Sequence, residues 1–166
     1  MSQKAPTRSR KNRPMGAEQR LKELGIELPP PAQPVGAYVP AVRTGRLICT
    51  AGQLPMRRGQ LAAVGKVPVE VPLAGAQAAA RQAVLNALAA VRDVAGSLDA
   101  VAQIVRLNVY VNSSPGFTDQ AKVANAASEL LADVFGPAGA HSRCAIGAAE
   151  LPLDAPVELD LIVEAD

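Results

Sequence analysis

The sequence has few aromatic residues, few cysteines and one histidine, and each shortage excludes a class of function. Phe, Tyr and Trp make up 2% of the 166 residues, so the aromatic platforms on which single-stranded nucleic acid stacks are nearly absent. Cys49 and Cys144 are far apart, and His141 alone cannot complete a Cys/His zinc site. We therefore predict reduced thiols and no metal, and we disfavour RNA or DNA as a partner.

Long apolar runs are also missing. No run approaches the ~20 residues needed to span a bilayer, and the first residues lack the apolar segment of a secretory signal. We therefore expect a cytoplasmic protein that is not embedded in a membrane.

Charge is distributed unevenly along the chain. Residues 1–15 hold five of the 17 positive charges; the other 12 stand against 15 Asp and Glu, which leaves the rest with a net charge of −3. We read residues 1–15 as a basic disordered tail, which could touch anionic surfaces but which we expect to have no specific partner. Residues 16–166 have the length of one domain.

The apolar periodicity predicts an α+β domain. We expect a short helix over about 16–24, an extended proline-rich connector over 28–36, and a hairpin of strands 46–51 and 61–67. A long helix over 71–95, a strand over 104–111, a helix over 123–134 and strands over 142–148 and 157–164 follow. The order is ββαβαββ, and two helices packed on one face of a mixed sheet would bury both helical stripes.

Two strands show clear alternation. In the strand 104–111 the face predicted to be apolar consists of Val105, Leu107, Val109 and Val111. In the last strand Val157, Leu159, Leu161 and Val163 should face the helices, which leaves Glu158, Asp160, Ile162 and Glu164 opposite. Such an acidic, partly apolar face is either solvated, or covered by another subunit and made into a site.

Several motifs in sequence order carry a family resemblance. They read PVGAYVP at 34–40, TAGQLP at 50–55, AARQAVLN at 79–86, SRCAIG at 142–147, LP at 151–152 and VEL at 157–159. Together they resemble the RidA/YjgF family, earlier labelled endoribonuclease L-PSP. RLKELGIELP near the start and HSR at 141–143 resemble a branch of longer members.

The resemblance implies a chorismate-mutase-like fold and a homotrimer with three sites in the clefts between subunits. It also implies a deaminase for metabolite damage control, which hydrolyses reactive enamines and imines such as 2-aminoacrylate to a keto acid and ammonia. No metal or organic cofactor is implied, and the expected ligand is a small imine or enamine that bears a carboxylate.

By the motif match Arg143 corresponds to the arginine that binds the substrate, and Glu158 to the acid near the attacking water. A guanidinium can hold a carboxylate bidentately. Glu158 could accept a hydrogen bond from water or pass a proton to the leaving amine if burial raises its pKa. Without the motif match, both residues would be read as a surface or interface ion pair.

The resemblance assigns further residues to the same site. Tyr38 corresponds to the aromatic residue that closes the pocket, and Gly52 and Gln53 to the turn that lines it. The backbone carbonyl of Cys144 or Ala145 could orient the water. Cys144 as a nucleophile is disfavoured, because the reaction needs no covalent step, and His141 is expected at the rim or in a structural role.

One departure keeps a second function open. Many deaminating relatives have serine where this chain has Ala51, so a hydroxyl that could hold the carboxylate is missing. A non-catalytic member that binds a small carboxylate in the same cleft is the alternative. A ribonuclease is disfavoured, because cleaving RNA without metal usually needs a matched acid and base, often two histidines.

Overall fold

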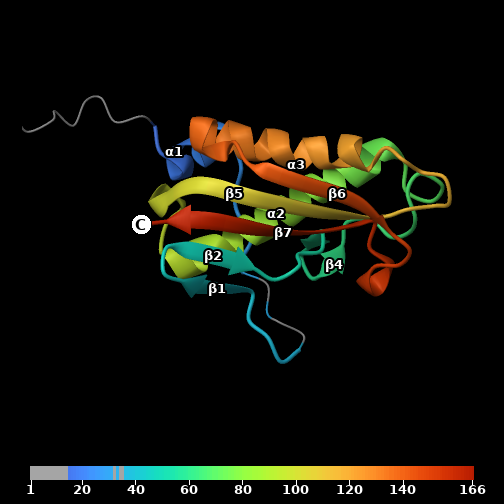
Figure 1. Cartoon of the computed structure of the whole chain (residues 1–166), viewed down its shortest axis with the longest axis horizontal. Helices are drawn as coiled ribbons and strands as arrows, with labels where there is room; N and C mark the ends of the chain where they lie inside the picture. Colours follow the sequence, from blue (N-terminus) through green and yellow to red (C-terminus); the bar gives the residue numbers. More distant parts are fainter. Residues whose placement is uncertain (1–14, 32, 34–35) are drawn as a thin grey trace, which may run out of the picture.

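A computed structural model describes residues 15–31, 33 and 36–166. They form a five-stranded sheet in the order β1-β2-β7-β5-β6, with helices packed on it (Figure 1). The α+β class is therefore confirmed. The tail predicted for residues 1–15 lies, except for Met15, outside the described residues. None of the described helices is long and apolar enough to cross a membrane.

The bounds of the elements follow the chain. The helices are α1 (Ala17–Glu23), α2 (Leu73–Ala95) and α3 (Gln120–Phe135), with short 3-10 turns at Leu98–Ala100, Gly136–Gly139 and Pro152–Asp154. The strands are β1 (Ala41–Thr44), β2 (Leu47–Thr50), β3 (Met56–Arg57), β4 (Gln60–Leu61), β5 (Val101–Asn112), β6 (Ser142–Ala148) and β7 (Val157–Ala165). Only β5 and β6 pair in parallel; the other pairs in the sheet are antiparallel.

The predicted first hairpin is wrong. β2 pairs with β1, not with 61–67, through a tight turn at Gly45 with φ +57°. Residues 61–67 contribute only Leu61 to a strand, because β4 pairs with β3 in a separate two-stranded ribbon. Gly65, with φ +116°, interrupts the extended backbone after it. The edge strand β1 begins at Ala41, after the predicted connector, at positions for which we predicted no strand.

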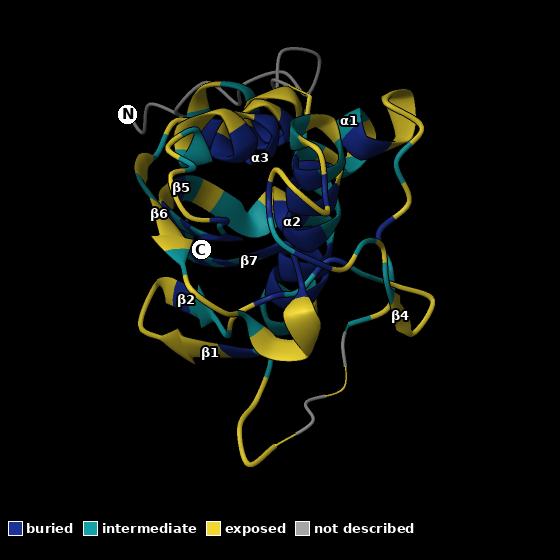
Figure 2. Cartoon of the chain, turned by 90° about the vertical axis from the view of Figure 1, so that its right-hand side faces the viewer, coloured by how far each residue is buried: buried dark blue, intermediate teal, exposed yellow. Residues whose placement is uncertain are grey.

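The two long helices supply the buried layer. α2 buries Ala80, Val84, Leu88 and Val91, as predicted, and Gly96 ends it in the left-handed conformation. α3 buries the expected apolar stripe: Val123, Ala127, Leu130, Leu131 and Val134. Figure 2 shows the buried residues gathered in these helices and in the strands beside them.

The face of β5 differs from the prediction at one end. Leu107, Val109 and Val111 are buried as expected, but Val105 is 37% exposed and Ile104 is fully buried. A shift in the pairing register with β7 between Ile104 and Arg106 moves the side chains before it to the other face. Bulges of this kind leave little signal in a sequence that alternates cleanly.

The last strand agrees with the prediction throughout. Val157, Leu159, Leu161 and Val163 are fully buried against the helices, while Glu158, Asp160, Ile162 and Glu164 are partly exposed on the opposite face. We call this opposite side of the five-stranded sheet the open face. Nothing in the described part of the chain packs across it as a second layer.

Candidate functional site

Glu158 lies on the open face beside the turn that follows β2. A Cβ on Gly52 would come within 2.0 Å of Glu158 Oε1, so only glycine lets the turn approach the carboxylate this closely. The next residue fixes the turn: Gln53 N–H donates to Leu159 O at 2.7 Å, and Leu159 N–H donates back to Gln53 O at 3.1 Å. The structure therefore brings three predicted site residues together, namely Gly52, Gln53 and Glu158.

The carboxyl group of Glu158 is poised to take up a proton. Burial, and after it the negative charge of Asp160, raise the pKa of Glu158 above its ordinary value. Asp160 accepts a hydrogen bond of 2.8 Å from Asn108 Nδ2 on β5. A carboxyl group with a raised pKa next to a charged one is a pattern that suits acid–base chemistry.

Tyr110 is a polar residue of this region that the sequence reasoning missed. It lies opposite Glu158 in the register of β5 and β7. Burial, followed by the charge of Asp160, raises the pKa of Tyr110, so its hydroxyl stays protonated at neutral pH. Its place in the alternation of β5, on the face away from the core, was the available signal.

Arg143 is held elsewhere in the chain. It lies on β6, the edge strand, and its Nη1 donates to Asn125 Oδ1 at 2.8 Å and to Ser128 Oγ at 3.1 Å, both on α3. β5 lies between β6 and β7 in the sheet, and Arg143 turns to the helix side, whereas Glu158 is on the open face. One chain therefore does not bring Arg143 and Glu158 together.

The neighbours of Arg143 divide between the two sides of β6. Cys144 lies opposite Asn108 in the β5–β6 register, on the side of the open face. Ala145 packs against the hydrophobic core. Cys144 is a free thiol and partly buried, as is Cys49.

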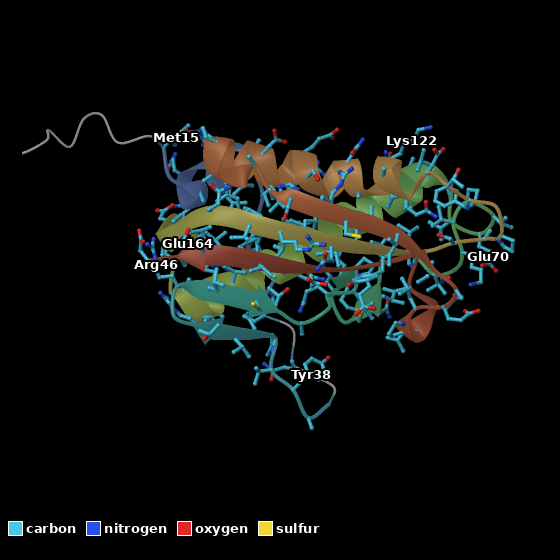
Figure 3. All side chains as sticks on the ribbon, in the orientation of Figure 1. Met15, Tyr38, Arg46, Glu70, Lys122 and Glu164 are labelled. Atoms are coloured by element: carbon cyan, nitrogen blue, oxygen red, sulfur yellow. The ribbon has the colours of Figure 1, made fainter. Side chains whose placement is uncertain are left out.

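Tyr38 lies on the loop before β1, where Figure 3 shows it projecting from the body of the molecule. Its side chain is 53% exposed. Together with Gly52 and Gln53 it lines a cavity of about 1000 Å³ whose other walls include Pro29–Pro31 and Met56. Tyr38 and the Gly52–Gln53 turn thus line the same cavity.

Asn86 supports the wall of this cavity and was not predicted as a site residue. It is 5% exposed, and its Nδ2 donates to Leu54 O at 2.8 Å and to Met56 O at 3.0 Å. A polar residue within the apolar stripe of a long helix was the signal. Asn86 ties the segment after Gln53 to α2.

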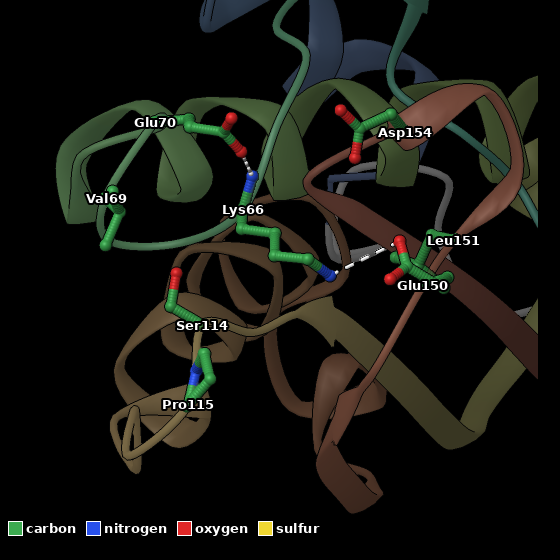
Figure 4. A pocket seen from close by; sticks show the side chains of 8 residues that line it. All are labelled: Lys66, Val69, Glu70, Ser114, Pro115, Glu150, Leu151 and Asp154. Carbon is green, nitrogen blue, oxygen red and sulfur yellow. Dashed lines mark hydrogen bonds and ion pairs between the residues drawn. The ribbon is translucent and has the colours of Figure 1, made fainter.

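A second cavity, of about 580 Å³, is lined by residues from the segments 66–70, 114–115 and 150–154 (Figure 4). Lys66 Nζ contacts Asn112 Oδ1 at 2.9 Å and Glu150 Oε2 at 3.3 Å, and its backbone N–H donates to Glu70 Oε2 at 2.7 Å. Asn112 Nδ2 in turn donates to Asp154 Oδ1 at 2.8 Å. These partnered groups fix the turn before β7, and we assign them a structural role.

The described residues hold no cluster of three or more His, Cys, Asp or Glu side chains that could bind a metal ion. The candidate site consists of Glu158, Asp160 and Tyr110 on the open face and of the Gly52–Gln53 turn after β2. The same turn also lines the cavity beside Tyr38. This defines a small α+β domain with a candidate small-molecule site on one face of its sheet.

The comparisons with known proteins agree with this class. The family model described as "YjgF/chorismate_mutase-like, putative endoribonuclease" matches residues 18–164, and the chain belongs to this family. Protein TCP17 of Trypanosoma cruzi is 43% identical over 145 residues, which cover 87% of this chain and 91% of that protein.

Solved structures show the same fold. The protein Atu1372 of Agrobacterium tumefaciens, whose function is unknown, has a TM-score of 0.83 at 44% identity and covers 90% of this chain and 92% of its own. A Shewanella oneidensis protein described as a "putative endoribonuclease" has a TM-score of 0.87 at 33% identity, covering 90% of this chain and 99% of its own. Escherichia coli TdcF, solved with bound serine, has a TM-score of 0.59 at 25% identity, covering 82% and 93%.

Proposed function

We propose that this protein hydrolyses reactive enamines and imines, such as 2-aminoacrylate, to a keto acid and ammonia in clefts between the subunits of a homotrimer. The observation that carries the proposal is the raised pKa of Glu158 beside the Gly52–Gln53 turn. A relative that binds serine supports a small amino-acid-like ligand. The reaction itself is the one that the resemblance of the motifs to deaminating RidA/YjgF members implies.

Each residue has a role in the proposed reaction. Water adds to the carbon of the C=N bond while Glu158 takes the proton that the water loses. Glu158 then returns this proton to the nitrogen to give a carbinolamine. The C–N bond of the carbinolamine breaks as the proton of its hydroxyl group passes to the nitrogen, so that the C=O bond of the keto acid forms and ammonia leaves. A group whose pKa lies nearer neutral pH can do both steps, and Arg143 of a second subunit would hold the carboxylate.

The separation of Arg143 from Glu158 within one chain supports a site shared by two copies. A substrate carboxylate and its reacting carbon are only a bond apart, so the arginine and the acid must lie within one cleft. Because β5 separates them in a single chain, a second copy must supply the missing group.

The test is an assay in which an amino-acid dehydratase generates the imine and keto-acid release is followed with and without this protein. Wild type should accelerate release. Arg143→Ala should lose about 30- to several thousand-fold in kcat/KM, because unpairing a charge typically costs about 2–5 kcal/mol. Arg143→Lys keeps the charge without the planar fork and should be impaired as well.

The control for this assay is assembly. If Arg143→Ala keeps the oligomeric state of wild type and also its full activity, the assigned site is wrong and the residue is an ordinary surface charge.

A second candidate function is binding of a small carboxylate without turnover. The observation that favours it is Ala51, which stands just before the Gly52–Gln53 turn and has no hydroxyl to offer a ligand. Stabilisation of the protein by a keto acid, without acceleration of imine hydrolysis, would select this function.

A further inference from the structure

The guanidinium of Arg143 is held at one of its three nitrogens. Nη1 carries two N–H groups, and it makes two hydrogen bonds, to Asn125 Oδ1 at 2.8 Å and to Ser128 Oγ at 3.1 Å. Both donors of Nη1 are therefore committed to α3.

Ser128 is itself oriented by a histidine. His141 Nδ1 lies 2.6 Å from Gly139 O, and His141 Nε2 lies 3.0 Å from Ser128 Oγ. A carbonyl oxygen can only accept, so Nδ1 carries the proton, and in the neutral imidazole Nε2 is left as an acceptor. The Ser128 hydroxyl then donates to His141 and turns its lone pairs toward Arg143.

The other edge of the guanidinium stays available. Nε–H and the Nη2–H beside it point the same way along one edge, and neither has a hydrogen-bond partner among the residues that the structure describes. Two parallel N–H groups on one edge match the two oxygens of a carboxylate. With Nη1 occupied, this edge is the one at which a carboxylate can be held bidentately.

We propose that Ser128, Asn125 and His141 are positioning residues, which clamp Arg143 through Nη1 so that it receives the substrate carboxylate side-on through Nε and Nη2. The inference rests on the proposed function in taking the ligand to be a carboxylate. It adds a set of residues on α3 and before β6 that hold the arginine in place before the substrate arrives. An arginine ordered in advance loses less side-chain entropy on binding.

The first test compares Ser128→Ala with Ser97→Ala. Ser97→Ala is the matched control, because it also removes a serine hydroxyl, in this case one that accepts a hydrogen bond from the backbone N–H of Asp99 at the turn after α2. Ser128→Ala should raise KM for the imine by about 3- to 30-fold and leave kcat within about twofold, because the clamp serves binding in the ground and transition states alike. Ser97→Ala should leave KM unchanged. An unchanged KM in Ser128→Ala would overturn the proposal.

The second test separates orientation from simple packing at His141. Gln at 141 can still offer an acceptor to Ser128, whereas Asn is too short to do so. His141→Gln should therefore raise the KM for the imine less than His141→Asn does. Equal effects of both variants, with equal losses of thermal stability, would assign the histidine to packing alone.

A third measurement does not depend on turnover. Rotation of the Arg143 guanidinium can be followed by side-chain ¹⁵N NMR, with the signal assigned by its absence in Arg143→Lys. Rotation should be slow in wild type and in Ser97→Ala, and fast in Ser128→Ala. Fast rotation in wild type would overturn the clamp, even if the protein proves to be a deaminase.

The failure of the proposed function would look different. If wild type neither hydrolyses imines nor is stabilised by pyruvate, a small carboxylate is not the ligand of this protein. The proposed side-on binding of a carboxylate by Arg143 is then wrong as well. Slow Arg143 rotation in that case would show that the clamp exists for another purpose.

Discussion

Because Gly52 has no side chain, the turn after β2 can lie close to the carboxyl group of Glu158, whose pKa is raised. The turn approaches the carboxylate so closely that any Cβ at position 52 would collide with Oε1. This approach removes water from the carboxylate, and the loss of water is the main reason that the pKa of Glu158 is raised. Glycine at this position therefore serves the acid as well as the turn.

Replacing Glu158 by Gln should stabilise the fold at neutral pH. The pKa of Glu158 is higher in the folded chain than in the unfolded one, so the stability it contributes is present below the ordinary Glu pKa of about 4.3 and is lost as the pH rises through the raised value. A Gln side chain does not titrate, so Glu158→Gln does not lose stability in this way as the pH rises. At pH 7 the free energy of unfolding of Glu158→Gln, measured by thermal unfolding, should exceed that of wild type by less than about 1 kcal/mol, since solvent screens a half-exposed group. This gain should vanish below about pH 4.3.

Glu129→Gln on the exposed side of α3 is the control, because it removes a charge without relieving burial. It should show no gain at pH 7. In the imine assay the Glu158 variant should lose about 10²- to 10⁴-fold in kcat, the range typical of general acid–base groups. A less stable Glu158→Gln at pH 7 would contradict the assigned cause of the pKa shift.

At the scale of elements, α2 does more than cover the sheet. Its buried Asn86 donates to the carbonyls of Leu54 and Met56, and its Oδ1 accepts from Gln82 Nε2 at 3.1 Å. The helix thereby holds the irregular segment that follows the Gly52–Gln53 turn. This part of the cavity wall is thus tied to the helix behind it.

Asn86→Ala should destabilise the protein by about 1–3 kcal/mol, because two backbone carbonyls lose their buried donor. Chemical denaturation measures this loss. Gln82→Ala removes a partner of Asn86 but neither of those carbonyl bonds, and it should cost well under half as much. Equal costs would mean that packing on α2, and not the tie to Leu54 and Met56, explains the role of Asn86.

At the scale of the whole molecule, the open face exposes more apolar surface than a solvated sheet needs. Val42, Leu47 and Ile146 from three strands are 54%, 40% and 47% exposed, and Ile162 lies among the acids of β7. Apolar residues gathered on one face of a small domain mark an interface. The open face is therefore the surface that we expect other copies to cover.

We predict a homotrimer, with a mass three times the chain mass of 17.1 kDa, in sedimentation equilibrium at micromolar concentration. Ile146→Asp should shift the equilibrium toward monomer, because it buries a charge in the interface. Leu24→Asp is a matched control, since Leu24, at the C-terminal end of α1, is also 47% exposed but lies away from the open face. A wild type that stays monomeric would remove the shared site.

The sequence by itself determined the long, regular elements and the family. The stripes of α2 and α3 and the alternation of β7 repeat over several turns or residue pairs, so burial on one side has to follow from their order. The motifs around Gly52, Arg143 and Glu158 were also readable, because glycine, arginine and a strand-borne acid are chemically distinctive.

Only the tertiary structure decided which groups meet. The position of the β1–β2 hairpin beside β7 and the shift in β5 depend on pairing with strands far away in the sequence, which local periodicity does not record. The hydrogen bonds of Ser128 with Arg143 and His141, and the contact of Gly52 with Glu158, join residues 13 to 106 positions apart. Their proximity results from the order of strands and the packing of α3, and no segment of the sequence contains that information alone.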